Sequence, residues 1–147
     1  SYTVENMFAQ KQKMENIAEI VKLSLVAISA VSLMVSGLGV MTVMSASVIE
    51  RTHEIGIKKA VGAKNAAILG EFIAEGCLLS FYGAILGLLA GQGITWIACQ
   101  LLSLEFQTDP TLLMGGAVMT VLLGTVFSAK PALRAAQLDP VKALASE

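Results

Sequence analysis

The residues of this sequence that are best suited to chemistry lie in one short charged stretch, "RTHEIGIKKAVGAK", at positions 51–64. Four of the chain's ten basic residues fall within it, together with the only histidine. Ile57 and Val61 lie one helical turn apart among these charges. Apolar side chains that enter a groove, next to charges that set the register, are typical of a short docking helix. The alternative is a plain connector whose lysines meet lipid headgroups, and the residues alone leave both interpretations open.

Catalytic and metal-binding chemistry finds no support in the sequence. The phosphate-binding pattern GxxxxGK[ST] is absent. The lone His53 cannot supply a nucleophile–base pair, and no His, Cys, Asp and Glu residues have metal-ligand spacing. Cys77 and Cys99 would lie about 33 Å apart along one helix, too far for a disulfide bond. We therefore expect that the chain is not an enzyme by itself, that it binds no cofactor or metal, and that its energy comes from a partner.

The elements around the charged stretch are strongly apolar. Of the 147 residues, 55% are hydrophobic and only 14% are charged, which is too few charges to cover a soluble domain of this size. Three runs, Leu23–Ile49, Gly76–Leu104 and Pro110–Ala129, contain no charge. Each is long enough to cross a bilayer as a helix of roughly 20 residues. The predicted fold class is therefore an all-α integral membrane protein with three transmembrane helices.

Basic residues predict the orientation of these spans, because they accumulate in short cytoplasmic loops. The loop after the first span and the tail after the third are basic, whereas residues 99–110 contain neither lysine nor arginine. The N-terminus is therefore expected outside the cell membrane and the C-terminus in the cytoplasm. The predicted segments are an extracytoplasmic stalk helix (1–22), a transmembrane helix (23–49), a cytoplasmic coupling segment (50–65), a transmembrane helix (66–98), an extracytoplasmic loop (99–110), a transmembrane helix (111–130) and a cytoplasmic tail (131–147).

A seven-residue apolar repeat runs through the N-terminal segment at Met7, Met14, Val21 and Ile28. Such a repeat indicates a helix that packs along another helix. Together with the first span, it predicts one continuous helix over about residues 5–55, on the order of 75 Å long. That length exceeds the bilayer thickness and would form a stalk outside the membrane. The alternative is a separate interfacial helix that precedes the span.

Small residues recur at every fourth position in the second and third spans. The two rows are Gly83, Gly87 and Gly91, and Gly116, Thr120, Gly124 and Ser128. Such rows let helix backbones approach closely in lipid. We therefore predict that the five glycines of these rows pack against other helices. The rows do not indicate a pore, because the spans offer few polar or charged residues to line one.

The residues around Gly56 favour a bend between the first span and a short cytoplasmic helix. Without a bend, apolar and acidic side chains would share one helix face. With it, the span ends near Ile55, and a short helix over Ile57–Val61 stops at Gly62. Asn65 is then the predicted N-cap of the second span.

Glu75 lies inside the predicted second span, where an ionised carboxylate is costly. In one interpretation it pairs with Lys64 or with a partner protein. In the other it responds, like Glu71 one turn earlier, only to the positive N-terminal end of the helix. Both interpretations stay open, and Glu75 is kept as a candidate motif acid.

Two motifs carry a resemblance to a known family. "ERTHEIGIKKAVGAK" at 50–64 is followed by "EFIAEG" at 71–76 and a glycine-rich span, and "PALRAAQLDPVKALASE" occupies 131–147. In this order they resemble the FtsX-like permease family, over nearly the whole chain after residue 23. The second motif resembles the MacB branch of that family, the macrolide-exporter type of ABC transporter permease. The sequence departs from the pattern at Lys130, where the family usually has an apolar or aromatic residue, and at Ser128, where glycine is common.

The resemblance implies a dimeric permease with four spans in each protomer and a large extracytoplasmic domain between the first two. This chain would hold spans two to four and the stalk, and a start at Ser1 is consistent with a fragment or a split permease. The segment between its first two spans would be the coupling helix that docks on an ATP-binding subunit or domain. The residues implied at that contact are Arg51, Glu54, Ile55, Gly56, Ile57, Lys58, Lys59, Ala60, Val61, Gly62 and Ala63. The family also has an acid at the position of Glu75.

The function that the resemblance implies is a permease subunit that relays ATP-driven movement to an extracytoplasmic domain for export. The implied partners are an ABC ATPase that carries ATP and Mg²⁺, a second permease protomer, identical or related, the lipid of the bacterial inner membrane and a periplasmic adaptor; no nucleic acid is implied. Two rival functions stay open: a cell-division-type FtsX permease that controls a wall hydrolase, and a lipoprotein-release permease or passive scaffold. The region that contacts substrate would lie mostly outside this chain.

Overall fold

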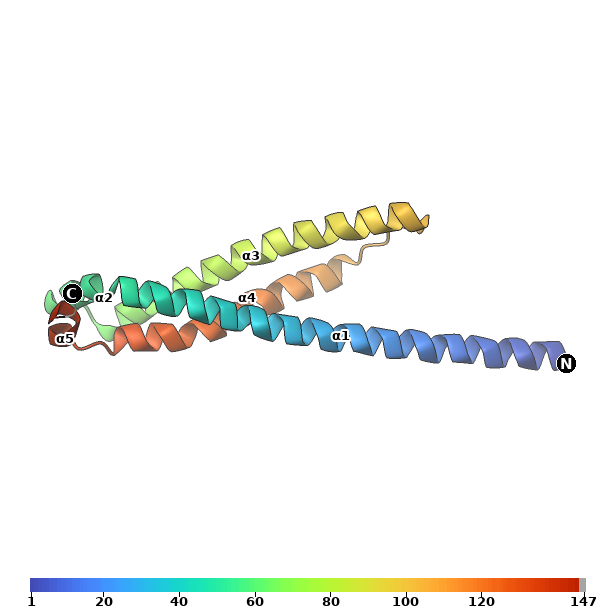
Figure 1. The fold of residues 1–147 in the computed structure, drawn as a ribbon, viewed down its shortest axis with the longest axis horizontal. Coiled ribbons are helices and arrows are strands. Elements are labelled where there is room, and N and C mark those ends of the chain that lie inside the picture. The colour runs from blue at the N-terminus through green and yellow to red at the C-terminus, as the bar shows by residue number, and fades with distance from the viewer. Residues whose placement is uncertain (146–147) are drawn as a thin grey trace. The chain divides into compact units, whose positions relative to one another are not determined.

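The computed structural model describes residues 1–145, which form α-helices and the short connections between them (Figure 1). The helices are α1 (Tyr2–Glu50), α2 (Thr52–Ala60), α3 (Asn65–Leu102), α4 (Pro110–Ala136) and α5 (Pro140–Ala145). Helices α1, α3 and α4 are long and apolar enough to cross a membrane. The predicted all-α class with three long apolar helices is therefore confirmed. Residues 146–147 of the predicted tail lie outside the described residues.

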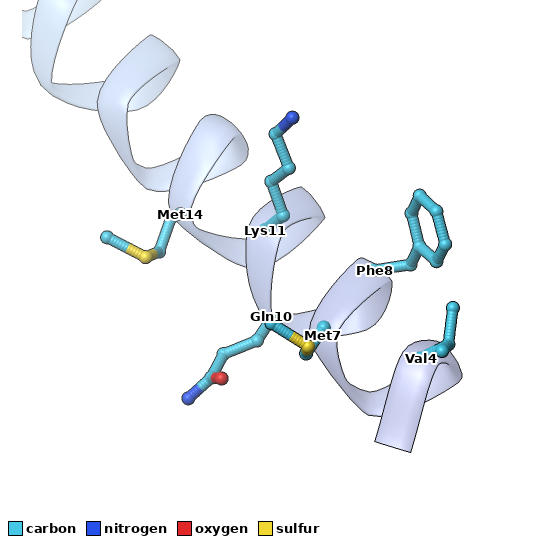
Figure 2. Close-up of a pocket in the computed structure, with 6 residues that line it drawn as sticks. All are labelled: Val4, Met7, Phe8, Gln10, Lys11 and Met14. Carbon is cyan, nitrogen blue, oxygen red and sulfur yellow. The ribbon is translucent and has the colours of Figure 1, made fainter. Parts of the chain in front are cut away.

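Residues 1–35, all but the first within α1, form one compact unit. The apolar side chains of this unit face outward, and Met7 and Met14 are 66% and 69% exposed. Figure 2 shows Val4 and Phe8 one turn apart on one side of the helix, where they help to line an open apolar hollow. Within this unit, the seam of the seven-residue repeat meets no second helix, so the stalk stays a prediction.

The second unit begins at Ser36 and has one apolar core. The core residues are Met44 and Val48 on α1, Ile55 on α2, Ile68 and Phe72 on α3, and Ala132 and Ala135 on α4. These residues bring the last turns of α1, the first turns of α3 and the last turns of α4 together around α2. The core therefore lies beside the charged stretch and determines where its side chains can point.

Helices α3 and α4 lie side by side and run in opposite directions (Figure 1). Gly76 on α3 faces Ser128 on α4, and Gly124 on α4 faces Ser80 on α3; a Cβ atom added at either glycine would overlap the facing serine. The Ser80 hydroxyl donates to the Gly76 carbonyl at 2.8 Å, so this buried polar group is satisfied within its own helix. Small residues thus allow close helix contact, as expected for helices in lipid.

The bend predicted at Gly56 is wrong, because the helix breaks at Arg51, between α1 and α2. Arg51 has φ −99° and ψ 13°, and the Thr52 hydroxyl donates to the Val48 carbonyl at 2.9 Å across the break. Gly56 lies inside α2 instead, where it is buried against Ala143 of α5. The close contact with α5 outweighs the cost of about 1 kcal/mol that glycine has inside a helix.

The predicted N-cap of the second span is also wrong. Asn65 is the first residue of α3 rather than its N-cap, and Lys64, which precedes it, makes no side-chain capping hydrogen bond. Helix α4 continues beyond the predicted span (111–130), through Pro131 to Ala136. A proline interrupts helical hydrogen bonding, but Pro131 and Ala132 are buried here. Burial of this small-residue face explains why the helix continues.

Helix α5 lies in the segment that was predicted only as a tail. The Asp139 carboxylate accepts a hydrogen bond from the Val141 N–H at 3.0 Å, and Pro140 takes the first helical position, as is common at a helix start. Ala143 is buried, and α5 packs on α2 (Figure 1). A helix this short is not stable alone, so its contact with α2 stabilises it.

Gly62 follows α2 with φ of 100°, a conformation that residues with a Cβ atom rarely adopt. We expect Gly62→Ala to lower the free energy of unfolding by about 1 kcal/mol. The control is Gly70→Ala, because Gly70 is helical and has open space around the added Cβ atom. Thermal unfolding of the purified protein in detergent would compare the two. A melting temperature of Gly62→Ala equal to that of the wild type would show that the connection relaxes without cost.

Candidate functional site

Helix α2 has two faces with different surroundings. Ile55 and Gly56 are buried on the face toward the core. Ile57 and Val61 point away from the core and are 47% and 84% exposed. Exposed aliphatic side chains one helical turn apart form an apolar strip that is suited to contact with another protein. We call Ile57, Ala60 and Val61 the outer strip of α2.

Arg51 is the centre of a charged cluster at the break between α1 and α2. Its Nε atom lies 3.3 Å from Glu54 Oε2, its Nη2 atom 3.2 Å from Glu71 Oε1 and its Nη1 atom 3.1 Å from Glu75 Oε2. The guanidinium carbon also lies 5.2 Å from the centroid of the Phe72 ring, within range of a cation–π interaction. One cation therefore ties the start of α2 to two turns of α3.

The environment of Arg51 keeps it charged. Partial burial opposes the charged form, but the hydrogen bond to Glu54 and the charges of Glu75, Glu54 and Glu71 outweigh this effect and raise the pKa of Arg51 above its ordinary value. Arginine is already protonated at any physiological pH. The net charge of the cluster can therefore change only by protonation of its carboxylates or by mutation.

The two lysines of α2 bind within the chain. Lys58 Nζ lies 2.9 Å from Glu71 Oε1 and 3.0 Å from Glu71 Oε2. Lys59 Nζ donates to the Leu138 carbonyl at 2.6 Å and also to the Ala136 carbonyl, at the C-terminal end of α4. A cation at this end of a helix satisfies carbonyls that have no partner within the helix. Lys59 therefore faces the protein interior and is not part of the outer strip.

The structure places the other residues of the predicted docking contact on both sides of α2. Glu54 and Gly62 are exposed, as is Ala60, whereas Ile55, Gly56 and Ala63 face the core. Glu75 pairs with Arg51, which corrects the predicted pairing with Lys64, whereas a contact of Glu75 with a partner protein stays a prediction. The first turn of α3 contains no acidic residue, and Glu75 lies well beyond it. The N-terminal end of α3 therefore does not explain this carboxylate.

The glycines of the two predicted rows differ in how tightly they pack within one chain. Gly124 packs tightly, whereas Gly83, Gly87, Gly91 and Gly116 have open space where a Cβ atom would lie. Packing of these four glycines against a second protomer stays a prediction. The glycine contacts that the rows did not identify are Gly76 with Ser128, Gly37 with Phe127 and Gly56 with Ala143. The contact of Gly76 with Ser128 could have been predicted, because Gly76 and Ser80 are small residues four positions apart.

No metal site is apparent in the described part of the chain, where no three His, Cys, Asp or Glu side chains are placed to hold an ion. Cys77 and Cys99 are unpaired and half-buried. The charged stretch thus presents an exposed apolar strip on a helix whose other side is held by ion pairs and packing. Such an arrangement is suited to binding a partner protein.

Comparison with known proteins gives a consistent result. The family model described as "FtsX-like permease C-terminal" matches residues 26–140. The macrolide export ATP-binding/permease protein MacB of Nitrobacter winogradskyi is 42% identical over 134 residues, which cover 91% of this chain and 21% of that protein. The uncharacterized ABC transporter permease YvrN of Bacillus subtilis is 38% identical over 146 residues, which cover 99% of this chain and 36% of that protein. The chain thus spans between about a fifth and about a third of these relatives' length.

Proposed function

Because this chain belongs to the FtsX-like permease family of ABC transporter permeases, we propose that α2 docks on an ABC ATPase and relays its movement to the membrane helices. The observation that carries this proposal is the exposure of Ile57 and Val61 on a helix whose other face is held by the same chain. A docking element must expose apolar surface to its partner. It must also be held firmly, or displacement of the helix would not reach the spans.

The proposed path of movement starts at the outer strip. ATP binding draws two ATPase subunits or domains together, and each carries one copy of α2 with it. Arg51 joins α2 to α1 through the backbone and to α3 through Glu71 and Glu75. A displacement of α2 would therefore move both helices, and α1 would pass the movement to a domain outside the membrane.

The remaining parts of the proposal concern assembly and location. The permease acts as a dimer in the bacterial inner membrane, with the N-terminal end of this chain outside and the C-terminal end in the cytoplasm. ATP and Mg²⁺ are bound by the ATPase partner, and this chain supplies no catalytic group. Relatives named for macrolide export support an efflux role of the MacB type, with a periplasmic adaptor as a further partner. The spans are almost free of charge and so offer few groups to line a substrate path through the membrane. This favours a mechanism that moves a domain outside the membrane.

The test of docking is Val61→Glu in the full-length permease assembled with its ATP-binding subunit or domain. A carboxylate that is buried without a partner at an interface is strongly unfavourable, so ATPase affinity should fall by at least about tenfold. Co-purification of a separate ATPase subunit measures this loss. Where the ATP-binding domain is fused to the permease, the rate of ATP hydrolysis in proteoliposomes measures it instead.

The matched control is Val141→Glu, which makes the same change at an exposed valine of α5. Val141 lies outside the outer strip, so this variant should bind the ATPase as the wild type does. Unchanged binding of Val61→Glu would remove the basis of the proposal. Equal losses in both variants would show that the effect is not specific to the outer strip.

A further inference from the structure

Helix α2 is fastened to the end of α4 as well as to α1 and α3. Lys59 Nζ donates to the Leu138 carbonyl at 2.6 Å and to the Ala136 carbonyl. Ala136 is the last residue of α4, and Leu138 lies in the connection to α5. These carbonyls lie at the end of a helix, where they have no helical donor. Lys59 therefore acts as a direct polar link between α2 and the end of α4.

A second contact joins α2 to α5, which directly follows α4. A Cβ atom at Gly56 would lie 2.9 Å from the Ala143 Cβ atom and 3.3 Å from the Leu144 backbone nitrogen. Ala143 is only 1% exposed. The two helices therefore lie so close that a side chain at position 56 would press against Ala143. Residues 137–139 are the only chain between α4 and α5, so α5 can transfer a displacement to α4 over a short distance.

Apart from the packing of Ile55 against the core residues of α3, the contacts around α2 and α3 are ion pairs. The side chains of Glu71 and Glu75 are 42% and 44% exposed in their pairs with Arg51. Water and salt screen such pairs. The contact of Gly56 with Ala143 is apolar and buried, so salt does not screen it. Besides the packing of Ile55 in the core, α2 therefore has a second connection that salt does not screen, to the α4–α5 corner, residues 136–143.

We infer that α2 drives α4 directly: α2 and the α4–α5 corner move as one body, and movement of the docking helix reaches the last span through Lys59 and the contact of Gly56 with Ala143. This inference rests on the proposed docking of α2 on an ATPase. It adds a third moving helix to the path through α1 and α3. It also gives the C-terminal helix α5 a role, with Ala143 as a positioning residue for α2.

The experiment follows movement at α1 and α4 separately. Single cysteines carrying nitroxide labels are placed at exposed positions, Ile49→Cys on α1 or Arg134→Cys on α4. The native Cys77 and Cys99 are replaced by serine. The ATP-dependent change in label mobility is then recorded in the full-length transporter, assembled with its ATP-binding partner in proteoliposomes. The wild-type background should respond to ATP at both positions.

The decisive variant is Gly56→Ala, which places a methyl group against Ala143. The response at position 134 should fall on the order of tenfold, while the response at position 49 persists. Ala143→Gly added to Gly56→Ala removes the facing methyl group and should restore the response at position 134. Lys59→Met removes the other link without added bulk and should also lower the response at position 134.

Two other outcomes of this experiment would contradict the inference. Wild-type responses at both positions in Gly56→Ala and in Lys59→Met would show that α5 and Lys59 transmit no movement to α4. Equal losses at positions 49 and 134 would show that the contact only holds the bundle together and gives no separate route. Val61→Glu distinguishes these results from failure of docking, because loss of docking abolishes both responses while the contact of Gly56 with Ala143 stays intact.

Discussion

A leucine at position 124 is expected to force α3 away from α4 and to destabilise the folded protein strongly. The Cβ atom alone would lie 2.5 Å from the Ser80 Cβ atom and would overlap the Ser80 hydroxyl. The Ser80 Cβ atom is fixed by the backbone of α3, so rotation of the side chain cannot relieve this overlap. Overpacking at such a site costs about 1–3 kcal/mol or more, a large part of the stability of a small domain.

The matched control for Gly124→Leu is Gly87→Leu, because Gly87 has open space where its Cβ atom would lie. Thermal unfolding and the yield of monodisperse protein in detergent compare the two variants. The control should keep the wild-type melting temperature. If the row of Gly83, Gly87 and Gly91 packs against a second protomer, Gly87→Leu should lower the dimer fraction without lowering the melting temperature. Equal destabilisation by both leucines would contradict the packing of α3 on α4 described above.

The second large effect is expected from Arg51→Glu. The change removes the cation shared by Glu54, Glu71 and Glu75 and adds a carboxylate beside them. It also removes the contact with the Phe72 ring. Each lost pair is partly exposed and contributes at most about 1 kcal/mol. Three lost pairs and the new repulsion together should lower the free energy of unfolding by on the order of 2 kcal/mol.

The charge swap Arg51→Glu with Glu75→Arg tests whether pairing explains this effect. Glu75 has no other charged partner within 4 Å among the described residues, so the swap restores one pair and reduces the local excess of carboxylates. About half of the lost stability should return, measured by denaturant unfolding. Lys64→Glu, at an exposed position outside the cluster, serves as the control for a change of charge. A swap that is no more stable than Arg51→Glu would show that pairing with Glu75 has little weight.

Sequence periodicity and charge predicted much of this fold. Uncharged runs identified α1, α3 and α4, because a bilayer requires long apolar helices and tolerates few charges. The exposed positions of Ile57 and Val61 also agree with the helical pattern of the charged stretch. Both inferences depend on local periodicity, which a single sequence contains.

The boundaries and partners around α2 could not be predicted in the same way, because they depend on tertiary contacts. Gly56 stays helical because Ala143, far away in the sequence, packs on it. Pro131 stays inside α4 because its surroundings bury it. Lys59 binds carbonyls at the end of α4 and in the α4–α5 connection, whereas the family resemblance implied a lysine at the docking contact.

The central claim is that the outer strip of α2 touches the ATPase, and site-specific crosslinking tests it most directly. A photo-crosslinking amino acid is placed at position 61 of the full-length permease in membranes, and a second protein carries it at position 43, an exposed position on α1. The account predicts a crosslink from position 61 to the ATP-binding subunit or domain, and none from position 43. Crosslinks from position 61 to lipid alone would contradict the account and identify α2 as a connector at the membrane surface.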